Sequence, residues 1–275
     1  MKIVNLVENT EGSCGCGAEH GLCFYIETAQ HKLLMDTGAS DLLLKNARIK
    51  GIDLNAVDTV ILSHGHYDHG GGLSAFAALN RHAVIYMHAG ADGAYYSVRQ
   101  GEPPRYVGLS ETVKALPGIV MVEEDHRIID EELELFAGIP LTPPLSPSNA
   151  RMKRLTEKGM EQDDFGHEQC LVIRQGEQKF LFSGCAHHGI CNVMTRFREL
   201  YGCDPDAVFS GFHMMRKEGY TREDLDAAAK TAEALLEYDT HFYTGHCTGV
   251  RPYEVMKEIM QERLAYVHCG DELVK

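Results

Sequence analysis

Residues 61–73, ILSHGHYDHGGGL, place three histidines and one aspartate within six positions, directly after a short apolar run. That run, TVIL in AVDTVILSH, is typical of a buried strand. His64 and His66 are two residues apart, so on a strand both side chains would point the same way and could bind one metal ion. Asp68 and His69 follow where the chain turns and could bind a second ion nearby. The spacing therefore predicts a dinuclear metal site.

Three glycines, Gly70 to Gly72, follow these residues, and we interpret them as allowing the backbone to pass close to the ions. A mixture of imidazole and carboxylate ligands suits zinc first, with manganese or iron as alternatives. The competing interpretation is a solvated polar loop that happens to be rich in histidine. The ligand spacing directly after a buried type of strand favours the metal site.

One segment cannot supply every ligand for two ions, and the later sequence repeats a pattern of short apolar run, glycine and histidine. FLFSGCAHHG supplies Cys185 and His187, SGFHM supplies His213, and YTGHCTG supplies His246. His167, in FGHEQ, is a rival for one ligand position. We expect these segments to converge on the histidines of residues 61–73.

The chain alternates strand-like and helix-like segments, which predicts a sheet covered by helices. The clearest helix starts at Thr221, where Thr221 and Asp224 resemble a capping box, and a second follows Pro252. Residues 93–108 and 138–154 are rich in glycine, proline and polar residues and are predicted to be long loops that form the substrate wall.

Composition limits the classes of protein to consider. The 275 residues are 44% apolar and are long enough to form a single domain, residues 1–275, around one full core. No run reaches the roughly 18 apolar residues of a membrane span, and no signal peptide is evident at the start. The nine cysteines are scattered along the chain, which suits a reducing compartment. We therefore expect a cytoplasmic protein. A net charge of −14 argues against a nucleic-acid or membrane surface, but it allows a small anionic substrate in one local site. The oligomeric state stays open.

The sequence also resembles a known family. HGHYDH matches the His-x-His-x-Asp-His signature of the metallo-β-lactamase fold superfamily, and LLMDTG matches the strand and turn that usually precede it. AEHGLCFYIE, HEQCLVI, LFSGCAHHGICNV, GFHM and GHCTG are similar to the branch of 7,8-dihydropterin-6-methyl-4-(β-ribofuranosyl)aminobenzene-5′-phosphate synthase. These matches run from about Lys2 to Gly249.

The resemblance implies an αββα sandwich with a dinuclear metal site at the edge of its two sheets. Carried over residue by residue, the first ion would be held by His64, His66 and His187, and the second by Asp68, His69 and His246. Most members of the superfamily have a bridging aspartate where this chain has Cys185. Either the Cys185 thiolate contributes to the bridge, or a hydroxide bridges alone.

Several other residues have two possible roles. Asp36, in DTG, either orients a ligand histidine or shapes a turn. His213 is a catalytic acid, a phosphate contact or a structural residue, and the branch resemblance brings Glu19 and His20 near the pocket. Arg99 and Arg105 could bind an anion, although solvation is the default for surface arginines.

We therefore expect a hydrolase in which a hydroxide between two divalent ions attacks a small, anionic (phospho)ester, with Asp68 and His213 as catalytic residues. A pterin-linked condensing synthase is one alternative. An iron-dependent oxidoreductase or dioxygenase is another, although flavodiiron enzymes place glutamate where this chain has His66. A ribonuclease and a catalytically silent metal-binding module are less favoured.

Overall fold

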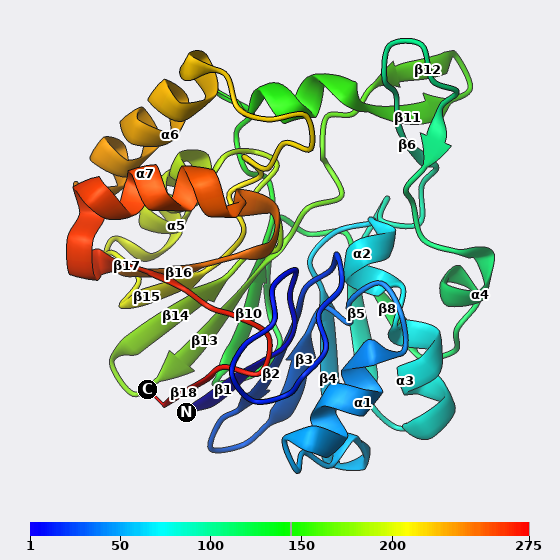
Figure 1. Cartoon of the computed structure of the whole chain (residues 1–275). Helices are drawn as coiled ribbons and strands as arrows, with labels where there is room; N and C mark the ends of the chain where they lie inside the picture. The colour runs from blue at the N-terminus through cyan, green and yellow to red at the C-terminus, as the bar shows by residue number, and fades with distance from the viewer. Residues whose placement is uncertain (144, 275) are drawn as a thin grey trace.

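Two seven-stranded sheets pack face to face, and helices cover the outer surface of each, as Figure 1 shows. This computed structural model describes residues 1–143 and 145–274. The four layers confirm the expected αββα sandwich. The N-terminal strand pairs with the last strand of the chain, so the two ends lie side by side.

The first sheet combines antiparallel strands at one edge with parallel strands in the rest. In spatial order its strands are β18 (Glu272–Val274), β1 (Lys2–Val7), β2 (Cys23–Glu27), β3 (Lys32–Met35), β4 (Thr59–Leu62), β5 (Val84–His88) and β8 (Ile119–Val122). Alternate residues of each strand face opposite sides. In β4, Ile61 packs between the sheets, whereas Val60 and Leu62 pack against the helices.

The second sheet has four parallel strands followed by three antiparallel ones. Its spatial order is β17 (Leu264–Tyr266), β16 (His241–Thr244), β15 (Ala207–Phe209), β14 (Gln178–Phe182), β13 (Cys170–Gln175), β10 (Leu133–Phe136) and β9 (His126–Ile128). Phe182 and Phe209 stack with their ring centroids 4.6 Å apart, and Phe24 of the first sheet meets both rings edge-on. These aromatic rings join the two sheets.

The helices divide between the outer faces. On the first sheet lie α1 (Leu42–Ile49), α2 (Tyr67–Gly70), α3 (Leu73–Leu79) and α4 (Glu111–Lys114), and on the second α5 (Ile190–Tyr201), α6 (Arg222–Leu235) and α7 (Val250–Met260). Short 3-10 helices occur at η1 (Leu54–Ala56), η2 (Pro147–Arg151), η3 (His246–Thr248) and η4 (Gln261–Arg263). In the described part of the chain, no helix is both long and apolar enough to cross a bilayer.

The predicted capping box at the start of α6 is confirmed, because Thr221 and Asp224 exchange side-chain to backbone hydrogen bonds. The start predicted for α7 is wrong. The helix begins at Val250, before Pro252 rather than after it. Proline is tolerated there because the first turn of a helix has no intrahelical partners for its N–H groups.

The two segments predicted as long loops contain strands of a third, smaller sheet, which corrects that expectation. Its order is β12 (Gly159–Gln162), β11 (Met152–Thr156), β6 (Tyr95–Ser97) and β7 (Arg105–Tyr106). The sheet stands above the sandwich in Figure 1. β6 pairs with β11, which lies more than 50 residues further along the chain, so local periodicity could not reveal the pairing.

Candidate metal centre

The predicted ligands meet above the carboxyl ends of parallel strands. His64 to His69 follow β4, Cys185 and His187 follow β14, His213 follows β15, and His246 follows β16. Because β14, β15 and β16 are parallel, the loops after them emerge at one edge of the second sheet, where they face the loop after β4. The expected convergence is therefore observed.

The local geometry of the first two histidines differs from the expectation. β4 ends at Leu62, so His64 and His66 lie in the loop beyond it, and His66 stands directly before α2. The alternation of side chains along a strand therefore does not explain why they are neighbours. Both are buried, and their ring centroids are 4.6 Å apart because the loop turns back over the strand end.

The first cluster of donor atoms contains His64, Cys185 and His187, whose candidate ligand atoms all lie within 4.8 Å of one another. The Nε2 atoms of His64 and His187 are 3.3 Å apart. The His66 ring lies beside both, with its centroid 4.9 Å from that of His187. All four residues are buried.

The second cluster contains His69, Cys185 and His246, again within 4.8 Å of one another. His69 Nε2 lies 3.2 Å from Cys185 Sγ, and Asp68 Oδ2 lies 3.5 Å from His246 Nε2. Cys185 thus belongs to both clusters. It occupies the position between two sets of imidazoles, the position given to the bridging aspartate by the family resemblance.

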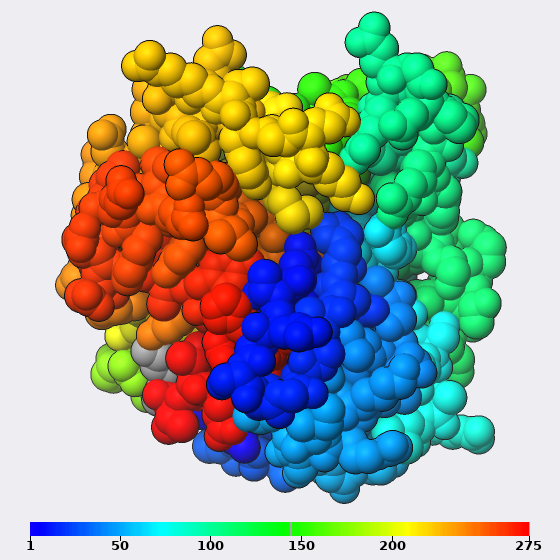
Figure 2. Space-filling view, in the orientation of Figure 1, coloured from blue at the N-terminus to red at the C-terminus, as the bar shows by residue number. Residues whose placement is uncertain are grey.

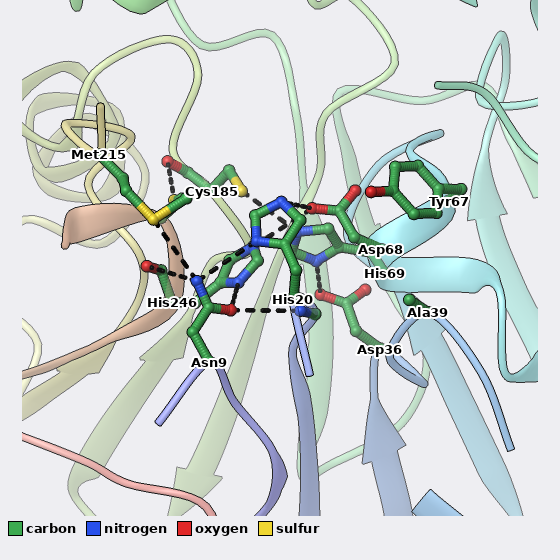
Figure 3. Close-up of polar contacts among 12 residues, drawn as sticks. Asn9, His20, Asp36, Ala39, Tyr67, Asp68, His69, Cys185, Met215 and His246 are labelled. Carbon is green, nitrogen blue, oxygen red and sulfur yellow. Dashed lines mark hydrogen bonds and ion pairs between the residues drawn. The ribbon is translucent and has the colours of Figure 1, made fainter. Parts of the chain in front are cut away.

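Oxygen atoms hold the Nδ1 side of the ligand histidines. The Nδ1 of His69 lies 2.6 Å from Asp36 Oδ2, and that of His246 lies 2.8 Å from Asn9 Oδ1, both visible in Figure 3. The Nδ1 atoms of His64 and His187 face Ser63 Oγ at 2.8 Å and Asn149 Oδ1 at 3.5 Å. With Nδ1–H donating to oxygen, each Nε2 keeps its lone pair for the centre.

The sequence analysis assigned this orienting role to Asp36 alone. Ser63 is the immediate neighbour of His64, a signal that was available. Asn9 contacts a histidine 237 residues away, and Asn149 one that is 38 residues away. Nothing in the local sequence around either asparagine indicates these contacts.

The unpaired atoms test whether this site fits metal ions. Among residues 1–143 and 145–274, the buried Nε2 atoms of His66 and His246 find no hydrogen-bond partner, and neither does either ring nitrogen of His213. A buried polar atom without a partner lowers the stability of the fold by about 1–3 kcal/mol. A bound metal ion or substrate would give these nitrogen atoms the missing partner. Imidazoles, a carboxylate and a thiol around one point form a donor set that suits zinc.

Burial sets the charge of this site. It lowers the pKa of His66 and of His246 to about 4, which keeps both rings neutral near pH 7. Burial alone would raise the pKa of the Asp68 carboxyl, but the contacts with His20 and His246 hold it well below its usual value. The site therefore offers neutral nitrogen donors beside an ionised carboxylate, which is the state that binds cations.

His167, the rival ligand, has both ring nitrogens engaged by the protein. Its Nδ1 accepts a hydrogen bond from the backbone N–H of Gly65 at 3.0 Å, and its Nε2 lies 3.3 Å from Asp163 Oδ2. The His66, Asp163 and His167 donor atoms still lie within 4.8 Å of one another. His167 is thus beside the centre but supports the loop that carries His66.

The pair Glu19 and His20 separates into two roles. His20 lines the cavity, and its Nε2 lies 3.2 Å from Asp68 Oδ2. Glu19 instead accepts hydrogen bonds from the backbone N–H groups of Ala39 and Ser40 and from the Ser40 hydroxyl. The Glu19 carboxylate therefore holds a turn, and of the two residues it is His20 that lines the cavity.

The glycines after the histidines also serve a different purpose from the expected one. A Cβ on Gly71 would lie 2.3 Å from the Ala39 carbonyl oxygen, and one on Gly72 would lie 2.2 Å from that of Thr37. They allow the chain to pack against residues 37–40 rather than to approach the ions. The glycine that touches the centre is Gly184, where a Cβ would lie 2.2 Å from Ser63 Oγ and 3.0 Å from His64 Nδ1.

A cavity opens above the two clusters. Residues from the third sheet and from the loop after β15 form its walls, and Figure 2 shows these two segments, green and yellow, standing on either side of a notch at the top of the molecule. Its lining includes His66, Asp68, Cys185, His187 and His213. Solvent therefore reaches the candidate ligands from this side.

Comparisons with known proteins agree with this fold. Residues 16–148 match the family model described as the metallo-beta-lactamase superfamily. The fold is also similar to that of zinc-bound PqqB from Methylobacterium extorquens, at 13% identity and a TM-score of 0.58, with 100% of each chain covered. The protein therefore has the metallo-β-lactamase fold, and its residues 16–148 resemble that superfamily in sequence.

Within the superfamily, the chain resembles two proteins more strongly. It is similar to the crystal structure of Tm1679, a metal-dependent hydrolase of the beta-lactamase superfamily, at 27% identity and a TM-score of 0.85, covering 100% of this chain and 99% of that one. It is also 26% identical over 299 residues to the 7,8-dihydropterin-6-methyl-4-(β-D-ribofuranosyl)-aminobenzene-5′-phosphate synthase of Methanocaldococcus jannaschii, covering 98% and 95% of the two chains. The resemblance to this branch that the sequence motifs indicated is confirmed.

Proposed function

We propose that this protein is a metal-dependent hydrolase that uses two divalent ions, zinc in preference to manganese or iron, on a small anionic (phospho)ester substrate. The observation that carries the proposal is the pair of donor clusters that share Cys185 beneath an open cavity. Two ions held next to each other are a common arrangement in enzymes that hydrolyse phosphoesters.

In this proposal His64, His66 and His187 hold the first ion, and Asp68, His69 and His246 hold the second. Cys185 contributes its sulfur to both clusters. Burial and the neighbouring Cys247 raise the pKa of the Cys185 thiol well above its usual value, so a nearby cation is needed to hold it as the thiolate. Because ligands come from loops of both sheets, residues 1–275 would act as one domain.

When bound, such ions lower the pKa of a coordinated water and polarise the scissile group. The chain's own residues would do the rest. Asp68 Oδ2 lies 3.2 Å from His20 Nε2, so Asp68 would accept a hydrogen bond from His20 there and take a proton from the attacking water. Burial lowers the pKa of His213 to about 3, so its ring is neutral at pH 7. We therefore assign His213 a hydrogen bond to a substrate oxygen rather than the role of acid.

A pterin-linked condensing synthase is the second candidate. The M. jannaschii relative, named as such a synthase, supports this candidate, because it is 26% identical over nearly the whole of both chains. Both candidates use the same donor clusters and differ in the reaction that follows. The hydrolase is placed first because it needs only water as the second reactant.

The test combines metal content with turnover. Protein purified without added metal is analysed for metals, and hydrolysis of bis(p-nitrophenyl) phosphate is measured for the wild type and for His66→Ala. Close to two zinc or manganese ions per chain, with turnover that the substitution abolishes, is the expected result. A single iron, or a full metal content without turnover, would remove the hydrolase and favour the synthase or an oxidative reaction.

A further inference from the structure

Arg151 is a half-buried cation in the wall of the cavity. It is the last residue of η2, directly before β11. Within the described ranges 1–143 and 145–274, its guanidinium has no ion pair, side-chain hydrogen bond or ring contact. Burial and the positive charges of Arg99 and Arg216 lower the pKa of Arg151. The carboxylate of Glu218 offsets these effects only in part, so this side chain lies among more positive than negative charges at the cavity wall.

Two neighbouring arginines already have an ion-pair or hydrogen-bond partner in the protein. Arg216 forms an ion pair with Asp224 at 2.6 Å, and Arg105 donates to the Tyr67 hydroxyl at 2.6 Å. Arg99 lines the same cavity, and its carboxylate contact, Glu218, is 4.0 Å away and almost fully exposed. Arg151 differs from Arg216 and Arg105 because it is half-buried at the cavity wall and has no side-chain partner among the described residues.

The position of Arg151 is tied to the metal centre. Asn149, two residues earlier in η2, donates from Nδ2 to the backbone oxygen of His187 at 2.7 Å and faces its Nδ1 through Oδ1. The next residue, Met152, starts β11 and lines the cavity. The guanidinium is thus carried by a segment that also contacts a candidate ligand. Lys217, on the loop after β15, lines the cavity as well.

We infer that Arg151, together with Arg99, binds a doubly charged phosphate group of the substrate, in the same cavity as the donor clusters. The planar guanidinium presents its N–H donors in a fork that matches two phosphate oxygens. Arg99, Arg151 and Lys217 bring three positive charges to the cavity walls, which a dianion balances better than a single carboxylate does. This subsite would select phosphorylated substrates. Its role in catalysis rests on the proposed function, because it would hold the substrate of that same reaction.

The experiment measures binding rather than turnover. Inorganic phosphate is titrated into the zinc-loaded protein by calorimetry at pH 7.5, with acetate as a second probe. A hydrogen bond to a charged group contributes roughly 1.5–3 kcal/mol, so Arg151→Gln should weaken phosphate binding by about tenfold or more. Arg151→Lys keeps the positive charge but loses the forked pair of N–H donors. Its affinity for phosphate should lie between those of the wild type and Arg151→Gln. Wild-type protein should bind phosphate at least about tenfold more tightly than acetate.

Lys153→Gln is the matched control. Lys153 is on β11, two residues from Arg151, and its Nζ donates to Gln162 rather than facing the cavity. The substitution Lys153→Gln changes the net charge by the same amount as Arg151→Gln and should leave the affinity for phosphate within twofold of the wild type. No measurable binding of phosphate to the wild type, equal binding by wild type and Arg151→Gln, or an equal loss in Lys153→Gln would overturn the inference. If Arg151→Gln loses phosphate while the wild type hydrolyses no phosphodiester, the proposed hydrolase fails and the phosphate subsite stands.

Discussion

Replacing Asp36 by asparagine should reverse the orientation of one ligand histidine without changing the shape of the site. Asp36 Oδ2 lies 2.6 Å from His69 Nδ1, and Oδ1 accepts the backbone N–H of Ser63 at 2.7 Å. In Asp36→Asn the carbonyl oxygen can still accept from Ser63, and the amide nitrogen then faces His69 Nδ1. An amide donates, so His69 would shift its proton to Nε2, the atom that points at Cys185.

The magnitude follows from the loss of one oriented ligand. Removing the partner that orients a metal-binding histidine typically lowers metal affinity by about 10- to 100-fold, which is roughly 1.4–2.7 kcal/mol. We expect the larger loss for the second ion, because His69 belongs to that cluster, and a smaller loss for the first, because Asp36 Oδ2 also accepts the Ser63 hydroxyl that faces His64 Nδ1. Asp36 has a positive φ of 62°, a backbone conformation that asparagine also tolerates, so the fold should survive the substitution.

The assay is a competition titration of zinc against a chromophoric chelator, which reports the affinity of each ion. Asp53→Asn is the matched control, since Asp53 is an exposed residue that caps η1 away from the cavity. Thermal unfolding of the metal-free proteins checks that both variants fold. The reasoning is refuted if both ions bind Asp36→Asn within threefold of the wild type.

Three further predictions concern the fold around the site. Phe182→Ala, which removes a ring buried between the sheets, should lower the free energy of unfolding by about 3–5 kcal/mol in a denaturant titration. Gly184→Ala places a Cβ 2.2 Å from Ser63 Oγ and should cause loss of the first ion by elemental analysis, whereas Gly176→Ala, on an open turn, should keep both ions. Burial would lower the pKa of His31, but Asp58, 2.8 Å from Nδ1, raises it, so its stabilisation is present below pH 6.5 and is lost as the pH rises through the raised value. The loss of unfolding free energy caused by His31→Gln should therefore be larger at pH 6 than at pH 8.5, by about 1 kcal/mol at most. The measurement is the denaturant midpoint of wild type and variant at both pH values. A loss that is equal at the two pH values, or larger at pH 8.5, contradicts the prediction.

Local sequence was enough to predict the centre of the candidate site. Four donor residues lie within the six positions from His64 to His69, so no long-range fold knowledge was needed to recognise them. Cys185, His187 and His246 could be added because each follows an apolar run and a glycine, and parallel strands deliver their carboxyl ends to one edge. The capping box of α6 was equally readable, since its two partners are three residues apart.

Other features could not be predicted because they depend on residues far apart in the chain. The orientation of His246 depends on Asn9, 237 residues away, and β6 pairs with β11 across more than 50 residues. Helix α5 was missed for another reason. Its buried positions, Ile190, Val193, Met194 and Phe197, follow the helical period, so the signal was present and was not used.

The sequence by itself determined the types of donor atom, their grouping after strands and the family resemblance, because these depend on residue identity and short spacing. Only the tertiary structure decided which nitrogen of each histidine faces the centre, that Cys185 joins two clusters, that Glu19 holds a turn and that Arg151 lines the cavity. Those properties are set by which side chains meet across the two sheets and their loops. Contacts of this kind join residues at no regular spacing along the chain. They form only when the sandwich has folded, so the sequence pattern does not predict them.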